Sequence, residues 1–318
     1  MPKGYHHLTY EQRCQIERLK GSVSEAEIAK KIGVHRSSIF RELARNSGPA
    51  GYFFKQAQEL TTAKRKMASG TVVRMTESNV ELIEKRLIEK WSPEQISGYF
   101  KANAVMEISH ESIYRHIWTE KAAGGLLYKS LRHTGKRYNK RGAKMAGRGL
   151  IPNRVDIDQR PKIVEEKSRI GDIEGDTIIG AQHKGAILSY VDRNSKYTKL
   201  ALLPNKKAQS VLIGTKQTLE PFKGRLHTIT FDNGKEFAGH ADLSEMLTVS
   251  CFFAKPYHSW ERGLNEHTNG LVRQYFPKST PFDILTPAMV QTVEDALNSR
   301  PRKILGYRTP REVFFSDA

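Results

Sequence analysis

Three carboxylates in the second half of the chain lie where strands and a helix could bring them together. Asp176 lies within an apolar run that predicts a strand, Asp232 directly follows another such run, and Glu266 lies on a predicted helix 34 positions later. Mg²⁺ prefers oxygen ligands, and three carboxylates can share two cations. The set predicts a site for in-line displacement at phosphorus with two Mg²⁺ ions, for which Mn²⁺ could substitute.

Each acid also fits an ordinary surface or turn role when taken alone. Asp232-Asn233-Gly234 is typical of a plain turn. Spacing leaves the choice of ligands open, and the alternative ligands nearby are Asp172, Glu174, Glu236 and Glu261. Arg273 lies two turns after Glu266, so we expect it on the same helix face, where it could hold a DNA phosphate.

The elements that must position these acids form an alternating pattern. Apolar runs predict strands at residues 173–179, 186–191, 198–203, 227–231 and 249–253. Helical periodicity covers residues 206–219, 235–247 and 287–298, and another helix starts near Glu261. Three strands followed by two parallel-type crossovers predict a mixed five-stranded α/β sheet covered by helices. Sites form at strand ends in such sheets.

The first fifty residues have a helix-turn-helix pattern. Thr9 with Gln12 and Ser24 with Glu27 form capping-box pairs, and Gly33 interrupts the pattern before a third helix. The apolar residues expected to bury the joint are Ile28, Val34 and Ile39. The polar residues that the third helix presents toward DNA bases and phosphates are His35, Arg36, Ser37, Ser38 and Arg41. A plain three-helix bundle with a charged face is the alternative.

A second helical region and a basic linker follow. Ser92-Pro93 and Ser109 begin helices within residues 51–125. The pattern of this region fits a second helix-turn-helix and fits equally a role in packing alone. Nine Lys/Arg and no acidic residue occur from Lys129 to Arg154, which predicts a linker over residues 126–160. The linker residues expected on the DNA backbone are Lys136, Arg137, Lys140 and Arg141. A solvated tether is a compatible reading. Residues 1–50 would be the first domain and residues 161–318 the catalytic core.

Charge and composition narrow the class of partner. The net charge is +18, and residues 1–155 carry +15 of it, which points to a polyanion such as DNA. Hydrophobic residues make up 38% of the chain, as in globular proteins. Cys14 and Cys251 lie too far apart in sequence for a CxxC zinc pair. No apolar run could span a membrane. We therefore expect a cytoplasmic, nucleoid-associated protein with no membrane partner and no small-molecule substrate.

Longer blocks of sequence resemble one family. The blocks are Gly171–Gly180, Thr230–Phe237, Pro256–Gly263 continuing to Lys278, and Leu297–Lys303 with Thr309-Pro310. In this order they resemble bacterial transposases of the insertion sequence 30 family, which have an Asp-Asp-Glu, ribonuclease-H-like integrase core. The resemblance places that triad on Asp176, Asp232 and Glu266, and the family's basic residue on Arg273. Two small departures are Ile173, where Trp is common, and His267, where Asn is common.

The resemblance implies an activity. The helix-turn-helix region would bind terminal inverted repeats, and the core would cut and join DNA strands, with at least a homodimer when two ends are paired. A catalytically silent DNA-binding repressor or domesticated relative is the alternative from another class. A related nuclease or phage-type integrase is the third interpretation.

Overall fold

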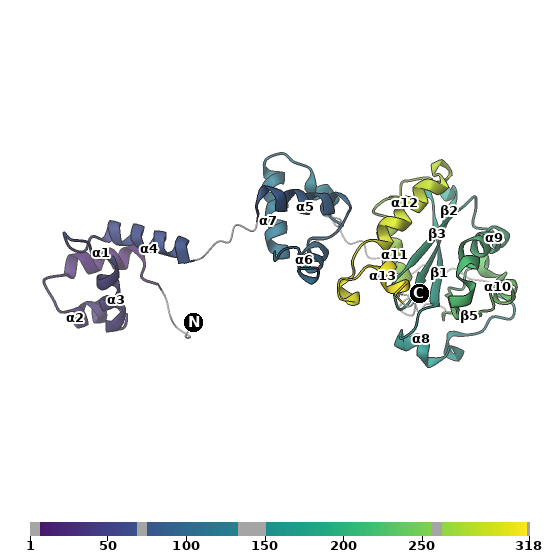
Figure 1. The fold of residues 1–318 in the computed structure, drawn as a ribbon, viewed down its shortest axis with the longest axis horizontal. Coiled ribbons are helices and arrows are strands. Elements are labelled where there is room, and N and C mark those ends of the chain that lie inside the picture. The colour runs from purple at the N-terminus through teal and green to yellow at the C-terminus, as the bar shows by residue number, and fades with distance from the viewer. Residues whose placement is uncertain (1–6, 69–74, 133–150, 256–262, 317–318) are drawn as a thin grey trace. The chain divides into compact units, whose positions relative to one another are not determined.

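The computed structural model describes residues 7–68, 75–132, 151–255 and 263–316, and the chain forms two compact units, Met1–Thr76 and Glu77–Ala318 (Figure 1). The first unit contains α1 (Tyr10–Leu19), α2 (Glu25–Ile32), α3 (Arg36–Asn46) and α4 (Phe54–Ala68). The second begins with α5 (Glu77–Ile88), α6 (Pro93–Ala102), α7 (His110–Ala122) and the 3-10 turn η1 (Leu127–Ser130). The predicted four-part division of the chain stays a prediction. None of the described helices is long and apolar enough to cross a membrane.

Local capping chemistry begins the helices of the first unit where the sequence predicted. Thr9 and Ser24 each form a reciprocal capping box with the residue three positions later. Gly33 ends α2 in the left-handed conformation, at φ 76°, which a residue with a Cβ rarely adopts. Ile28 and Ile39 are buried at the joint as expected, while Val34 is half-buried. The sequence pattern missed α4, which packs against α1 and α3 and completes this core.

A buried ion pair ties three parts of the first unit together. Arg13, which is 3% exposed, donates from Nε to Glu42 Oε1 at 2.7 Å and from Nη1 to the Leu8 carbonyl at 2.8 Å. The Tyr52 hydroxyl donates to Glu42 at 3.2 Å. The buried guanidinium is therefore compensated by a single carboxylate, and α1 and α3 are held at one relative position.

The second helical region also follows its capping signals. Ser92 forms a capping box with Gln95, and Pro93 occupies the first turn of α6. Ser109 caps α7, whose Ile113 and Ile117 are fully buried. The side chain of Gln95 donates to the carbonyl of Pro301 at 2.8 Å, so this helical region contacts the end of the chain within the second unit.

Five strands form one mixed sheet in the order β3-β2-β1-β4-β5. The strands are β1 (Asp172–Ile179), β2 (Ala186–Asp192), β3 (Thr198–Leu203), β4 (Thr228–Phe231) and β5 (Ser250–Phe253). The first three pair antiparallel, while β4 pairs parallel with β1 and β5 pairs parallel with β4. This order and direction confirm the predicted ribonuclease-H-like core.

Helices cover both faces of the sheet, as Figure 1 shows. On one face, α9 (Ala208–Leu219) and α10 (His240–Leu247) pack over alternate strand residues such as Ile229 and Phe231. On the other, α11 (Gly263–Val272) and α12 (Pro287–Asn298) pack over Ile178 and Ile187. The short helices α8 (Lys162–Glu166) and α13 (Pro310–Phe314) lie outside these layers. Since side chains alternate along a strand, the even-numbered residues of β1 face α11.

The predicted helix over residues 235–247 is wrong in its first turns. A 3-10 turn, η5 (Lys235–Phe237), precedes α10, and Gly239 takes the N-cap position between them. Two interactions draw this segment onto the sheet. The Phe237 ring stacks on Phe231 with centroids 4.4 Å apart, and Glu236 accepts a hydrogen bond from Thr177 at 3.0 Å. Packing of these side chains against the sheet replaces the regular helix that the periodicity suggested.

Glu42→Gln should destabilise the first unit by about 3 kcal/mol, because it leaves the buried Arg13 guanidinium without a counter-charge. Hydrogen–deuterium exchange with mass spectrometry on the full chain should show faster exchange in peptides from α1, α3 and α4. Glu59→Gln removes an exposed charge from α4 and is the matched control. Equal exchange in the two variants would contradict a stabilising role for the pair.

Candidate active site

The parallel pairing of β1 with β4 brings two aspartates to the same level. The register pairs Asp172 with Thr228 and Glu174 with Thr230. Two further positions along both strands, Asp176 reaches the level of Asp232, the residue that directly follows β4. Neighbouring strands lie about 4.8 Å apart. A sequence separation of 56 residues thus becomes adjacency between the middle of β1 and the end of β4.

Asp176 projects toward the α11 side of the sheet, and Asp232 Oδ1 accepts a hydrogen bond from the backbone N–H of Gly234 at 2.7 Å. Thr228 donates from its hydroxyl to Asp172 Oδ1 at 2.8 Å, so the first pair of this register meets on one face. Side chains alternate along a strand, so Asp176, four positions beyond Asp172 in β1, lies on the same face, while Asp232 directly follows β4 at the same level. Asp176 and Asp232 are both half-buried, so both carboxylates are partly open to solvent.

Helix α11 docks on β1 through two asparagines. The backbone N–H of Asn265 donates to Glu174 Oε2 at 3.2 Å, and the Asn269 amide donates to Asp176 Oδ2 at 2.7 Å. Four helical residues rise about 6 Å, and two strand residues rise about 6.6 Å. Because these rises agree, both contacts form along one line, and α11 runs in the direction of β1.

Glu266 lies near the start of α11, next to Asn265, which contacts Glu174 in β1. With 3.6 residues per turn, Glu266, Asn269 and Arg273 line one side of the helix. Asn269 contacts Asp176, and Arg273 donates to the carbonyl of Ile179 at 2.6 Å. Glu266 itself is exposed. The structure therefore brings Asp176 and Asp232 together and sets Glu266 one helical turn before the residue that contacts Asp176.

The alternative ligands near the aspartates have other partners. Asp172 accepts from Arg169 at 2.8 Å and is fully buried. Glu174 accepts from Arg193 at 2.6 Å as well as from α11. Glu236 pairs with Lys206 at 2.6 Å, and its hydrogen bond from Thr177 comes from the opposite face of the sheet. Glu261 lies outside the described residues. These contacts favour structural roles for Asp172, Glu174 and Glu236.

The donor set fits a hard divalent cation. Two carboxylates at one level of the sheet offer the oxygen ligands that Mg²⁺ prefers, and Glu266 offers a third from the helix flank. Within residues 7–68, 75–132, 151–255 and 263–316, no three His, Cys, Asp or Glu side chains are close enough together to hold a metal ion. Like charges repel, so bound cations would favour closer approach of the three carboxylates.

Arg273 makes contacts that the sequence did not predict. Its guanidinium donates to the backbone carbonyls of Ile179, Phe276 and Pro277, at 2.6, 3.5 and 3.4 Å. It also lies over the Phe282 ring, 5.2 Å from its centroid. These contacts fix the end of α11 against β1 and so position Glu266. The predicted contact of Arg273 with a DNA phosphate stays a prediction.

The third helix of the first unit presents most of its predicted DNA-contacting residues to solvent. His35, Arg36 and Arg41 are exposed, whereas Ser37 and Ser38 are half-buried. His35 caps α3 by accepting from the Ser37 N–H at 3.2 Å, and Arg41 donates to the Ser37 hydroxyl at 2.7 Å. These bonds pre-order the helix start. The linker residues Lys136, Arg137, Lys140 and Arg141 lie outside the described residues.

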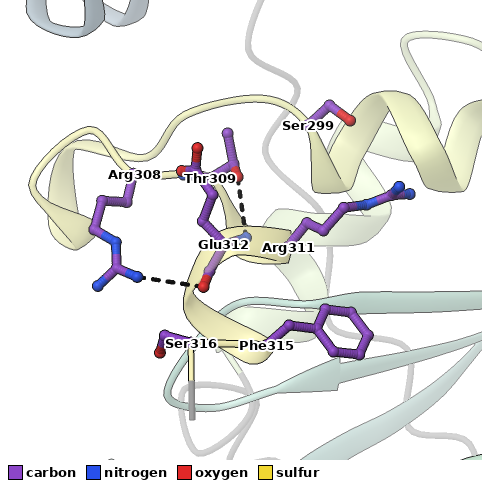
Figure 2. A pocket seen from close by; sticks show the side chains of 7 residues that line it. All are labelled: Ser299, Arg308, Thr309, Arg311, Glu312, Phe315 and Ser316. Carbon is purple, nitrogen blue, oxygen red and sulfur yellow. Dashed lines mark hydrogen bonds between the residues drawn. The ribbon is translucent and has the colours of Figure 1, made fainter. Parts of the chain in front are cut away.

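A hollow beside α13 is unrelated to the carboxylates. It has a volume of about 570 Å³ and is lined by residues that include Arg308, Arg311 and Glu312. Figure 2 shows Arg308 bonded to the backbone of Glu312, and Thr309 bonded to the same residue. Its polar groups thus stabilise the short helix α13, and the hollow gives no second candidate for catalysis.

Comparison with similar proteins shows which family the chain belongs to. The sequence matches the helix-turn-helix domain family over residues 4–46. It is 46% identical over 310 residues to the transposase of insertion sequence element IS4351 from Bacteroides fragilis, covering 97% of this chain and 95% of the relative. It is 32% identical to the transposase InsI of IS30A from Escherichia coli, covering 96% and 83%. The chain belongs to the insertion sequence 30 family of transposases.

A solved structure similar to this transposase is the catalytic core domain of BIV integrase. The identity is 21% and the TM-score 0.37, over 46% of this chain and 94% of that one. Family membership confirms the predicted enzyme class, a DNA transposase with an N-terminal helix-turn-helix domain. The two asparagines on α11 were not predicted as site residues. Their spacing of four, on either side of Glu266, was the available signal.

Asn269→Ala should slow strand cleavage by this transposase by about tenfold to a hundredfold and raise the Mg²⁺ concentration that it needs. The reason is that the Asp176 carboxylate loses the amide that orients it. Single-turnover cleavage across a Mg²⁺ titration measures both effects. Gln217→Ala on α9, an exposed site across the sheet, is the control. A wild-type rate in Asn269→Ala would show that the amide does not orient the site.

Proposed function

We propose that this transposase binds the terminal inverted repeats of its insertion sequence through α2 and α3, and cuts and joins DNA strands at Asp176, Asp232 and Glu266. The observation that carries the proposal is the β1–β4 register, which supports adjacency of the two aspartates. Asp176, Asp232 and Glu266 would hold two Mg²⁺ ions, or Mn²⁺ in their place.

The residues of the chain have distinct tasks in this reaction. When bound, two such ions activate the attacking hydroxyl and stabilise the leaving oxygen in in-line displacement at phosphorus. Asn269 orients Asp176 through its amide, and Arg273 holds the end of α11, which carries Glu266. No serine, tyrosine or cysteine nucleophile is needed.

The first unit supplies recognition. The exposed side chains of His35, Arg36 and Arg41 lie at the start and middle of α3, where such helices contact base edges in the major groove. The basic linker residues Lys136, Arg137, Lys140 and Arg141 would add affinity without sequence choice. Pairing two element ends requires at least two copies of the chain. The site of action would be the bacterial nucleoid.

Asp232→Asn should abolish cleavage at the element ends and leave end binding intact, because the substitution removes a ligand charge and keeps the side-chain shape. A supercoiled plasmid carrying the element's own ends is incubated with protein and Mg²⁺, and cuts and joints are mapped by sequencing. Breaks at the repeat tips with wild type alone are expected. Cleavage that persists in Asp232→Asn would remove this residue from the site. End binding without cleavage by wild type would instead favour the DNA-binding repressor.

Arg36→Ala should weaken binding to the inverted repeat by tenfold to a hundredfold, on the order of 1–3 kcal/mol for a lost base contact. Binding to unrelated DNA should change much less, and cleavage of pre-nicked ends should remain measurable. Competition binding with repeat and random duplexes gives the specificity ratio. Arg18→Ala removes an exposed charge from α1 and is the matched control. An unchanged ratio in Arg36→Ala would refute sequence reading by this residue.

A further inference from the structure

Arginines from two distant stretches of chain converge on the C-terminal half of α11 and the turn that follows it. Arg132 follows η1, and its Nη2 lies 3.4 Å from the position that a Cβ on Gly270 would take. Arg300 follows α12 and donates to Gln274 at 3.0 Å and to the Tyr275 hydroxyl at 2.7 Å. The sequence separation between the two arginines is 168 residues. Only the fold makes them neighbours.

A third arginine belongs to the same group. Arg302 lies two residues after Arg300 and donates to the Leu297 carbonyl at 3.1 Å. Burial, and then the charges of Arg300 and Arg132, lower the pKa of Arg302 to about 9. A guanidinium with such a pKa is still protonated at neutral pH. The three side chains, Arg132, Arg300 and Arg302, are called the arginine cluster below.

The arginine cluster has no acidic counterpart in the part of the chain that the structure describes. The ion pairs of the second unit engage other arginines, among them Arg160, Arg193 and Arg311. Arg300 is 2% exposed, and the Nε atoms of Arg300 and Arg302 are buried without a hydrogen-bond partner. Buried donors and charges of this kind are costly unless they are paired. The cluster is therefore suited to an anion that the exposed Arg132 and the half-buried Arg302 can contact, while the buried Arg300 adds positive charge without a direct contact.

We propose that the arginine cluster is an anion site, which holds a DNA backbone phosphate where the helical region meets the catalytic core. A phosphate matches the planar, forked donors of guanidinium groups. The site deepens the proposed function and rests on it, because it assumes that DNA lies on the core. It adds a contact distinct from the carboxylates and from the helix-turn-helix unit.

The surroundings of the cluster show what such a phosphate would do. The segment that carries Arg300 and Arg302 contacts α6, since Gln95 donates to Pro301 at 2.8 Å and Lys303 pairs with Glu94 at 2.6 Å. Arg132 comes from the end of the same helical region. The cluster and Asp176 both border α11, whose diameter with side chains is about 10 Å. A phosphate held there would fix DNA relative to the site while also joining the helical region to the core.

The test compares Arg132→Gln, Arg302→Gln and the double variant in the full chain. The probe is a short duplex of unrelated sequence, with binding measured across a salt series. Each single variant should weaken binding about tenfold and lower the salt slope by about one. The second substitution should add less than the first, because both remove contacts to one phosphate. Arg132 is exposed and makes no described hydrogen bond, so its variant should fold even if Arg302→Gln does not.

Lys101→Gln removes one positive charge from an exposed site on α6 and is the matched control. Two results together would overturn the proposed site. Arg132→Gln and Lys101→Gln would weaken DNA binding equally, and the effects of Arg132→Gln and Arg302→Gln would simply add. Binding would then depend on general charge attraction. A second measurement, with inorganic phosphate as the probe, distinguishes a phosphate of the DNA backbone from free phosphate. Phosphate could raise the melting temperature of wild type but not of the variants, while the variants bind DNA as well as wild type does. That result would show a site for the free anion and overturn the DNA contact.

Failure of this proposal is distinguishable from failure of the proposed function. Wild-type protein that cuts its element ends while Arg132→Gln keeps the full salt slope would refute the arginine cluster alone. Wild-type protein that binds the ends and never cuts them would refute the proposed function, whatever the variants do.

Discussion

The parallel pairing of β1 with β4 is the constraint on which the catalytic half of the molecule depends. Backbone hydrogen bonds fix the register, so Asp172 meets Thr228 and the two strands continue in step toward Asp176 and Asp232. A shift of one residue would turn one aspartate to the opposite face, where α9 and α10 bury apolar side chains. The apolar packing on both faces of the sheet thus stabilises the register that places the two aspartates.

A neutral amide, that of Asn269, holds α11 against the carboxylates of the site. Carboxylates held close together repel one another, and a lysine or arginine among them would compete with a cation for their oxygens. Asn269 donates one hydrogen bond to Asp176, and its own oxygen accepts from Ser189 at 3.0 Å. The contact between Asn269 and Asp176 therefore attaches the helix that carries Glu266 to the sheet through a neutral side chain. Arg273 completes the attachment from the helix end, through carbonyls rather than through the acids.

Positive charge is used in two different ways along the chain. In the first unit, Arg13 is buried and fully engaged with Glu42, and Arg36 is exposed on the helix that faces outward. In the second unit, the arginine cluster is packed against α11 without an acidic partner among the described residues. Paired charges stabilise the fold, whereas exposed or uncompensated ones are left for a polyanion. The net charge of +18 alone does not separate these roles.

Local chemistry in the sequence determined much of the architecture. Capping boxes at Thr9, Ser24 and Ser92, the left-handed Gly33 and the apolar alternation of the strands act over a few residues, so they could be recognised without the fold. They predicted the helix-turn-helix, the five strands, and the positions of Asp176 within a strand and of Asp232 at the end of another. The helix over 235–247 was predicted wrongly, because packing of Glu236 and Phe237 on the sheet is a long-range effect.

The tertiary structure decided which polar side chains belong together. Sequence spacing could not separate Asp176 from Asp172, Glu174 and Glu236, since that choice depends on strand register and on partners such as Arg169 and Arg193. It also could not show that Asn269 contacts Asp176, or that Arg132 and Arg300 meet at α11. Such residues lie far apart in the chain, and only the packed sheet and helices bring them close together.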